Sequence, residues 1–312
     1  MRAVGVNEYG GPEALEVVEL PDPTVDPGQV LVRVHAAAVN PTDTYVRNGA
    51  RAERQAGHPP PYVPGMDVAG VLEAVGEGVD TELQVGDRVM AIVVPKGRHG
   101  AYAERLALPA GSVVAAPAGT SHAEAATLPM NGLTARLALD LLDLETGDTL
   151  AVTGAAGTLG GLMIQLAKAD GLRVIADASE DDEPLVADLG ADVVVRRGDD
   201  VAARIREHAP DGVDGLLDGS VQNERLFDAV RDHGGFATVR GFQADAPRGI
   251  TLHQVWVWEY AEERAKLDRL RAQAEEGVLS LRVADTYPAE LAPETHRRLE
   301  AGGVRGRLIL EF

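Results

Sequence analysis

The segment AVTGAAGTLGG at residues 151–161 is the feature that most constrains the fold of this chain. Gly154, Gly157 and Gly160 recur at a three-residue spacing, after an apolar run at 148–154 that predicts a strand and before a run at 159–171 that predicts a helix. In this context glycines permit a tight turn and let a pyrophosphate approach backbone N–H groups at the positive helix end. The segment therefore predicts a dinucleotide-binding loop; a Gly-rich turn with no ligand is the alternative.

Strands and helices continue to alternate after this loop. A helix is predicted at 183–190, and strands are predicted at 172–178, 191–197, 213–219, 235–242 and 250–260. Alternation at this rhythm is typical of βαβ units and a parallel sheet. We therefore expect an α/β fold class with a Rossmann doubly wound parallel-sheet domain over residues 123–257.

The first third of the chain has a different pattern. Short β-type runs at 30–39, 67–79 and 85–94 are separated by Gly and Pro, which predicts a compact, mostly β domain. An Ala- and Leu-rich stretch at 121–144 follows, and Ser121 with Glu124 forms a capping box at its start. Pro129 and Gly132 are expected to divide this stretch into two helices.

The C-terminal segment resembles the first domain more than the parallel-sheet domain. It contains a predicted amphipathic helix at 262–276, a β-type run at 281–288, a short helix at 293–301 and a final strand at 307–312. We expect this segment to fold back onto the N-terminal part, so that residues 1–122 and 258–312 form one domain.

Composition restricts the partners of the chain. The net charge is −20, the acidic residues are spread along the whole sequence, and there is no cysteine. Nucleic acid is excluded as a partner because phosphate binding needs basic patches. No apolar run approaches the roughly 18 residues of a membrane span, and no leader pattern is visible, so no membrane partner and a cytoplasmic location are expected. The acidic surface suits a salt-rich cytosol.

Several segments together resemble the zeta-crystallin-type quinone oxidoreductases, a zinc-free branch of the medium-chain dehydrogenase/reductase superfamily. They are GGPEALEVVELPDP (10–23), VLVRVHAAAVNPTDTYVRNG (30–49), VPGMDVAGVLEAVGEGV (63–79), VGDRV (85–89), GAYAE (100–104), the glycine loop and AGGVRGRLIL (301–310). The resemblance implies a GroES-like catalytic domain beside the Rossmann domain, NADPH as the usual cofactor, and a quinone or α,β-unsaturated carbonyl as acceptor. We also expect a homodimer.

The three points where zinc-dependent members of the superfamily place metal ligands resemble Asn40, Met66 and Met130 in this chain. An amide and two thioethers cannot replace a Cys/His set for zinc. The chain is therefore predicted to lack zinc. Without a Lewis acid an alcohol is hard to activate, whereas an electron-poor acceptor needs less help, which agrees with a quinone or enone acceptor.

The resemblance also indicates the site residues. Asn40 and Tyr45 match polar residues near the nicotinamide and are the candidate catalytic residues; Tyr45 could hydrogen-bond the acceptor oxygen or donate a proton. The alternative is that both only position the cofactor or satisfy the local backbone. The predicted cofactor-binding residues are Gly154, Ala155, Ala156, Gly157, Thr158, Leu159, Gly160, Asp177, Ser179, Arg197 and Gly241.

Two arguments about cofactor choice conflict. Asp177 lies 20 residues after Gly157, where an acid reads a ribose hydroxyl and favours NAD(H), and the acids at 180–183 would repel a 2′-phosphate. Arg196 and Arg197 end the neighbouring strand and could pair with that phosphate. With the resemblance added, NADP(H) is expected rather than NAD(H).

Three segments depart from the family pattern and leave the substrate open: 50–63, 93–102 and 254–260. One alternative function is an enoyl-thioester reductase, which needs a basic groove, and the sequence shows no such cluster. Another is a weakly catalytic NADPH-binding protein of the crystallin or sensor kind. His35, His58, His99 and His253 lack metal-ligand spacing, and most are expected at the surface.

Overall fold

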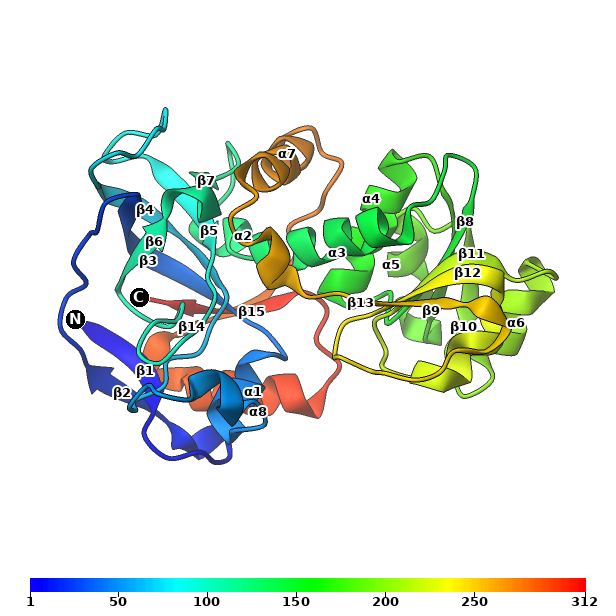
Figure 1. Cartoon of the computed structure of the whole chain (residues 1–312), viewed down its shortest axis with the longest axis horizontal. Coiled ribbons are helices and arrows are strands. Elements are labelled where there is room, and N and C mark those ends of the chain that lie inside the picture. The colour runs from blue at the N-terminus through cyan, green and yellow to red at the C-terminus, as the bar shows by residue number, and fades with distance from the viewer. The chain divides into compact units, whose positions relative to one another are not determined.

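The computed structural model describes all residues from Met1 to Phe312, which form two compact units (Figure 1). The first unit consists of Met1–Met130, Trp258–Glu276 and Leu281–Phe312, and the second of Asn131–Val257 and Gly277–Ser280. The chain passes from the first unit to the second within helix α3 (Pro129–Leu142). No helix is both long and apolar enough to cross a lipid bilayer.

The second unit contains a six-stranded, entirely parallel sheet in the order β10-β9-β8-β11-β12-β13. Its strands are β8 (Thr149–Thr153), β9 (Arg173–Ala178), β10 (Val193–Arg196), β11 (Val213–Asp218), β12 (Val230–Thr238) and β13 (Thr251–Gln254). In chain order this is 3-2-1-4-5-6, the order of a doubly wound dinucleotide fold. The expected parallel sheet is therefore confirmed.

The helices of the second unit connect these strands. They are the main part of α3, α4 (Thr158–Ala169), α5 (Glu183–Asp188) and α6 (Val201–His208). Helices on both faces explain why the central strands β8 and β11 are buried in nearly every position: Leu150, Val152 and Leu216 are all fully buried.

Three sequence predictions in this region need correction. The strand expected at 235–242 lies at Val230–Thr238 instead, so it begins and ends earlier than expected. The strand expected at 250–260 ends at Gln254, and Val257–Tyr260 forms a 3₁₀ turn instead. The reason is that its neighbour β12 ends at Thr238, so no pairing partner remains after Val255 donates to the Thr238 carbonyl. Gly132 does not interrupt a helix, since α3 runs through it, whereas Pro129 does start a new helix as expected.

The first unit is built on a mixed sheet in the order β14-β15-β3-β4-β5-β7, with β6 paired to β3 and a separate β1–β2 hairpin. The strands are β1 (Arg2–Val6), β2 (Leu15–Glu19), β3 (Gln29–Val39), β4 (Asp67–Val75), β5 (Arg88–Ile92), β6 (Arg105–Pro109), β7 (Val113–Ala115), β14 (Val283–Pro288) and β15 (Arg307–Glu311). As expected, the C-terminal strands join the sheet of the N-terminal part.

The helices of the first unit are short. They are α1 (Asp43–Asn48), α2 (His122–Ala125), α7 (Arg264–Glu275) and α8 (Ala292–Ala301), and α2 carries the predicted capping box of Ser121 and Glu124. The 3₁₀ turns of the whole chain are η1 (Pro12–Ala14), η2 (Ala52–Gln55), η3 (Ala110–Ser112), η4 (Glu180–Asp182), η5 (Asn223–Ala229), η6 (Pro247–Gly249), η7 (Val257–Tyr260) and η8 (Ala289–Leu291).

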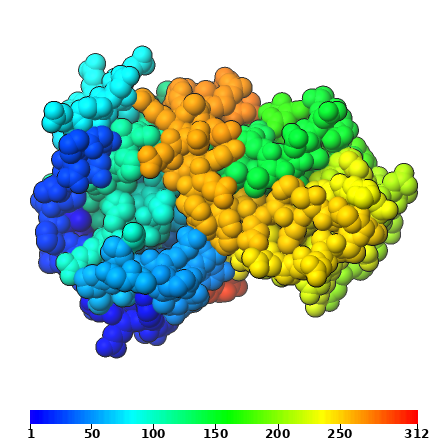
Figure 2. Space-filling model, in the orientation of Figure 1, coloured from blue at the N-terminus to red at the C-terminus, as the bar shows by residue number.

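Helix α7 is joined to the N-terminal part by hydrogen bonds from its first residue. Arg264 donates to the Asp80 carbonyl at 3.2 Å and to the Thr81 hydroxyl at 3.1 Å. In Figure 2 the orange atoms of the α7 segment accordingly lie beside the cyan atoms of the segment that precedes β5. These contacts show how residues 258–276 return to the first unit.

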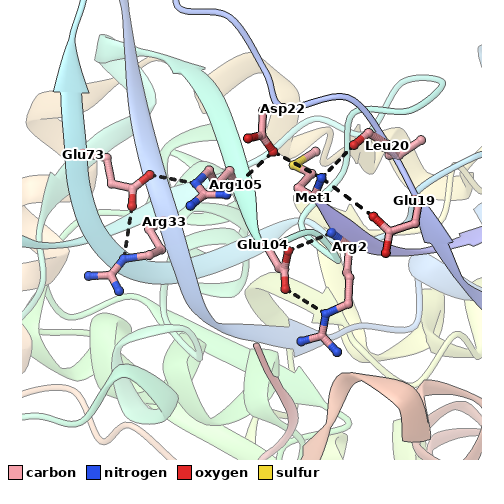
Figure 3. A network of polar contacts seen from close by, with 9 residues as sticks. All are labelled: Met1, Arg2, Glu19, Leu20, Asp22, Arg33, Glu73, Glu104 and Arg105. Carbon is pink, nitrogen blue, oxygen red and sulfur yellow. Dashed lines mark hydrogen bonds and ion pairs between the residues drawn. The ribbon is translucent and has the colours of Figure 1, made fainter.

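A network of ion pairs covers one face of the sheet in the first unit (Figure 3). Arg105 lies between Glu73 and Asp22, at 3.0 and 3.6 Å, and Arg33 pairs with the same Glu73 at 3.2 Å. Arg2 joins β1 to Glu104 at 2.9 Å. Single exposed pairs contribute little to stability, but here arginines separate acidic side chains that would otherwise repel one another.

Candidate active site

The glycine loop in the second unit follows β8 and opens α4, as the sequence predicts. Gly154 has a φ of 68°, a left-handed conformation that glycine adopts without strain. The N–H of Gly157 donates to the Gly154 carbonyl at 3.0 Å and closes the turn. Gly160 must be small, because a Cβ there would lie 2.4 Å from the Gly154 oxygen. Two of the three glycines are therefore required by the loop itself.

Gly157 differs because the loop does not need it to be glycine. Its φ of −69° suits any residue, and an added Cβ would meet only the Gly154 oxygen, at 3.1 Å. The neighbouring Thr158 hydroxyl is buried and has no hydrogen-bond partner within the protein. Open space at Gly157, an unsatisfied hydroxyl and the N-terminus of the 12-residue α4 together fit a pyrophosphate group.

Asp177 lies in β9, directly beneath this loop. Its Oδ1 atom accepts from the Ala155 N–H at 3.1 Å, whereas its Oδ2 atom is buried without a partner. Burial raises the pKa of Asp177, and the nearby charge of Arg197 partly offsets that effect. One oxygen of this carboxylate thus holds the loop, and the other is oriented as an acceptor that lacks a donor.

Two of the four acids at 180–183 are engaged with neighbours. Ser179 donates to Asp182 at 2.5 Å, and Glu180 pairs with Arg196 at 3.2 Å on the protein surface. Arg197 is exposed, and its backbone N–H donates to the Ala178 carbonyl at the end of β9. Ser179 and Arg197 therefore both lie at the strand ends where the adenine ribose is expected.

The loop after β11 is a part of the site that sequence reasoning missed. The sheet order reverses between β8 and β11, and loops at such a point bind ligands. Asp218 accepts from the hydroxyls of Thr153 and Ser220, at 3.0 and 3.1 Å, which ties this loop to the strand that leads into the glycine loop. The polar run DGSVQN after an apolar strand was the available signal.

Two amide side chains in this loop lack partners for their oxygens. Gln222 Oε1 and Asn223 Oδ1 are buried and accept no hydrogen bond within the protein. The backbone here is unusual as well, because Val221 and Asn223 have φ values of 60° and 57°. A β-branched residue in this region is strained, and such strain is concentrated at ligand sites.

Gly241, the last predicted cofactor residue, lies three positions after β12. It has a φ of 75°, and a Cβ on it would lie 2.8 Å from the ring of Trp256. Both features require glycine. The structure therefore explains Gly241 by the packing of Trp256, and whether Gly241 also contacts a cofactor stays a prediction.

In the first unit, Asn40 lies one residue after β3 and is completely buried. Its amide nitrogen donates to Asp67 Oδ2 at 2.6 Å, and the other oxygen of Asp67 accepts from the backbone N–H of Met130 at 2.6 Å. The Asp67 carboxylate thus links Asn40 and Met130, two of the three positions that resemble zinc-ligand positions.

Met66, the third such point, is also buried, and its sulfur accepts a hydrogen bond from the Thr42 hydroxyl at 3.4 Å. No group of three or more His, Cys, Asp or Glu side chains anywhere in the chain is arranged to hold a metal ion. The four histidines expected mostly at the surface are instead half-buried, and His35 stacks on His122 with ring centroids 4.7 Å apart.

Tyr45, the other candidate catalytic residue, lies in the first turn of α1 and is half-buried. The guanidinium carbon of Arg51 lies 5.0 Å from the centre of the Tyr45 ring. The position of Tyr45 is set by Asp43, two residues earlier, which accepts from the backbone N–H groups of Asn40 and Gly65 at 2.7 and 3.2 Å.

Asp43 also ends a buried polar chain that the sequence did not reveal. The Tyr102 hydroxyl donates to Asp43 at 3.0 Å and lies 3.2 Å from His296 Nε2, and Arg47 lies 3.2 Å from His296 Nδ1. Since Arg47 can only donate, His296 must carry its proton on Nε2 and donate it to the Tyr102 oxygen. The chain ends at Glu300, which Arg47 contacts at 2.6 Å.

Burial dominates the electrostatics of this cluster. It raises the pKa of Asp43 to about 7 and that of Asp67 to about 6, although donors to each and the buried Arg307 act in the opposite direction. Burial also lowers the pKa of His296 to about 3, helped by the charge of Arg47, so the ring is neutral at pH 7. The cluster therefore keeps a directed hydrogen-bond chain that reaches the backbone of Asn40 through Asp43.

Comparison with known proteins places this arrangement in a class. The alcohol dehydrogenase GroES-like domain family matches residues 26–129, and the zinc-binding dehydrogenase family matches residues 189–310. The expected fold class, a GroES-like domain with a Rossmann domain, is thereby confirmed. The second family's description names zinc, whereas the points of this chain that resemble zinc-ligand positions hold Asn40, Met66 and Met130.

Individual relatives narrow the class. The quinone oxidoreductase of Mus musculus is 32% identical over 99% of this chain and 97% of its own length, and a Solanum lycopersicum 2-methylene-furan-3-one reductase is 34% identical over 77% and 62%. The chain belongs to the quinone oxidoreductase family of the medium-chain dehydrogenase/reductase superfamily, the resemblance expected from its motifs, and is an oxidoreductase.

Solved structures agree with this assignment. A mycobacterial protein complexed with NADPH has a TM-score of 0.88 and 30% identity over all of both chains. A protein described as an NAD-dependent alcohol dehydrogenase has the same TM-score of 0.88 and 32% identity, also over all of both chains. Similar backbones thus accompany both cofactors, so cofactor choice depends on individual side chains.

Proposed function

We propose that this protein transfers hydride from NADPH to a quinone or an α,β-unsaturated carbonyl compound without a catalytic zinc ion. The names of its relatives, one of them matched over nearly its full length, support the acceptor class. The observation that carries the proposal is the pair of hydrogen bonds that the Asp67 carboxylate accepts. This carboxylate is engaged by Asn40 and Met130, so the candidate metal position holds an internal hydrogen-bond network in place of a ligand set.

The chemistry follows from that position. NADPH supplies a hydride, and the acceptor then needs protons on oxygen, for a quinone, or on the α-carbon, for an enone. Tyr45 contributes a hydroxyl that donates to the acceptor oxygen as negative charge develops there. Asn40 positions the loop before α1, because both its side chain and its backbone are held by buried carboxylates.

NADPH is proposed over NADH because of the side chains around Asp177. Glu180 is paired with Arg196, and Asp182 is turned toward Ser179, so two of the acids that would repel a 2′-phosphate are engaged elsewhere. Arg197 is exposed close to Asp177 and brings the cation that a 2′-phosphate requires. The NADPH complex of a related structure supports this choice.

The decisive experiment is a steady-state screen with purified protein in excess chelator. We expect NADPH oxidation with 1,4-naphthoquinone and with a simple enone, and no NADP⁺ reduction with primary alcohols. Crotonyl-CoA tests the enoyl-thioester alternative, and absence of turnover with every acceptor would favour a weakly catalytic NADPH-binding protein. Loss of quinone reduction on chelation, restored by zinc, would contradict the zinc-free mechanism.

We also infer a cytoplasmic homodimer. Strand β13 lies at the edge of the six-stranded sheet, where its outer side can pair with a second copy of the chain. The net charge of −20 suits a salt-rich cytosol, where repulsion between acidic surfaces is screened. Light scattering at low and high salt tests the dimer, and a monomer under both conditions would contradict it.

A further inference from the structure

Two tyrosine side chains stack on each other at the surface of the first unit. The rings of Tyr9 and Tyr62 are parallel to within 10°, and their centres lie 5.2 Å apart. Tyr9 is 39% exposed, more than any other Phe, Trp or Tyr residue of the chain, and Tyr62 is half-buried. Tyr9 also packs on Gly49, where an added Cβ would lie 2.8 Å from the ring. The pair takes no part in the proposed reaction, and solvent reaches it.

The two rings are aligned with their hydroxyl groups on the same side. Burial raises the pKa of the Tyr9 hydroxyl, and a hydrogen bond to the Tyr62 side chain raises it further. Parallel rings that share such a hydrogen bond must point in the same direction. Because the Cε carbons flank the hydroxyl-bearing carbon of each ring, stacking in this sense brings the Cε atoms of Tyr9 and Tyr62 next to one another.

Hydrogen bonds of the backbone hold both residues in place. Val6 and Tyr62 exchange a pair of N–H···O bonds of 2.9 Å each. The Gly10 N–H, next to Tyr9, donates to the Arg47 carbonyl at 3.2 Å, and the Arg47 side chain donates back to the Gly10 carbonyl at the same distance. The fold thus keeps the two rings together, although they lie 53 positions apart in the sequence.

We propose that Tyr9 and Tyr62 form an oxidative modification site, at which one-electron oxidation joins the two rings as a dityrosine. Each phenol loses one electron and its hydroxyl proton to hydrogen peroxide that is activated by a haem peroxidase. The two radicals join through a new Cε–Cε bond, and the Cε hydrogens then move to the oxygens as protons and restore both phenols. One C–C bond replaces two C–H bonds, and the two electrons and two protons reduce the peroxide to two molecules of water.

The composition of the chain favours this reaction. The chain has no cysteine, so no thiol is present to be oxidised first. The new bond adds a covalent link where Val6 already pairs with Tyr62, between β1 and the segment that leads into β4. A link of this kind restricts the unfolded chain, as a disulfide does, and so opposes the separation of these two segments.

The test treats dilute wild-type protein with a haem peroxidase and hydrogen peroxide. Single chains are then isolated by denaturing electrophoresis and digested with trypsin, which cleaves after arginine and places Tyr9 in peptide 3–33 and Tyr62 in peptide 55–88. We expect these two peptides to be joined, with a mass equal to their sum less two hydrogen atoms, and to show dityrosine fluorescence. Tyr9→Phe and Tyr62→Phe retain a ring for stacking, and each should abolish the product.

Tyr287→Phe is the matched control. It removes a half-buried tyrosine whose hydroxyl accepts a hydrogen bond from Arg298 at 2.6 Å, and the link between peptides 3–33 and 55–88 should persist in it. Three results would overturn the proposal: no such link in the folded wild type, a link that survives Tyr9→Phe, or crosslinks that are spread evenly over other pairs of tyrosines. None of these measurements depends on hydride transfer, so they stand whatever acceptor the protein reduces.

Discussion

The glycine loop of the second unit and the buried polar cluster of the first unit reach functional geometry in opposite ways. The loop uses backbone atoms from a few consecutive residues. Its conformation depends on glycines, which have no side chain beyond a hydrogen atom. The cluster uses polar side chains from α1, β4, α8 and β15, and its members Arg47 and Glu300 lie 253 positions apart in the chain. Local backbone geometry fixes the loop. The cluster is fixed because buried polar and charged side chains need hydrogen-bond partners.

This difference explains how each region tolerates change. The loop keeps its conformation through Gly154 and Gly160, and Gly157 is left open to the ligand. A substitution at Gly157 should therefore affect binding without affecting the fold. In the cluster the polar atoms are buried and hydrogen-bonded to one another, so substitutions should lower stability and, if the cluster positions Asn40 and Tyr45 as proposed, activity as well.

The largest effect is expected from Gly157→Asp in the loop. A carboxylate would occupy the pyrophosphate site and repel it, so the dissociation constant for NADPH should rise by roughly a hundredfold or more, that is by about 3 kcal/mol. The thermal unfolding midpoint should change little. Gly157→Ala is the control: its Cβ meets a single backbone oxygen at 3.1 Å and should have a much smaller effect. Unchanged NADPH binding by calorimetry in Gly157→Asp would show that the cofactor lies elsewhere.

In the cluster, Asp67→Ala should instead lower the free energy of unfolding. It leaves the Asn40 and Met130 donors unsatisfied and removes a carboxylate that compensates Arg307, which should cost about 3–5 kcal/mol in denaturant unfolding. Asp232→Ala removes a surface partner of Arg248 and should cost less than about 1 kcal/mol. Similar costs for the two variants would contradict the description of Asp67 as a buried organiser.

The pH dependence of stability should distinguish the cluster from the loop. Burial lowers the pKa of His296 to about 3, whereas the unfolded chain takes up this proton near pH 6.5. The contribution of His296 to stability is therefore complete above pH 6.5 and is lost as pH falls toward 3. In His296→Gln the slope of unfolding free energy between pH 4 and 6 should be shallower than in wild type by up to about 1.4 kcal/mol per pH unit. Equal slopes would mean that His296 is protonated in the folded state.

The smallest effect is expected at the edge of the cofactor site. Arg197→Ala should raise the KM for NADPH by about tenfold and leave the KM for NADH nearly constant, because only NADPH carries the 2′-phosphate. Arg269→Ala is the control, since Arg269 lies on α7 in the first unit, where it faces Glu276 at 3.6 Å. Equal responses to both cofactors would exclude Arg197 as the phosphate ligand. A wild-type preference for NADH would mean that the unpartnered oxygen of Asp177 binds the ribose hydroxyl instead.

Local sequence determined the parts of this protein that depend on backbone chemistry. The spacing of Gly154, Gly157 and Gly160 predicted the loop, the capping box of Ser121 and Glu124 predicted the start of α2, and alternating apolar runs predicted the parallel sheet. In the loop and the capping box the interacting atoms belong to residues within a few positions of one another, so the local sequence contains the whole interaction. The strands of the sheet pair over longer distances, but each strand and helix is indicated by its own apolar pattern. The segments NPTDTY and GAYAE also predicted the quinone oxidoreductase family, and the similarity to a known quinone oxidoreductase confirmed this prediction.

Tertiary structure alone decided which polar residues meet. Asp43, Tyr102 and His296 come from three distant segments, and nothing in the residues around any one of them indicates the others. The polar loop at Gln222 and Asn223 was missed although the run DGSVQN marks it in the sequence, and the strand at β13 was overextended because its partner ends early. Burying a charge has a large desolvation cost unless hydrogen-bond or ion-pair partners offset it. In this protein those partners lie far apart in the sequence, so only the tertiary structure brings them together.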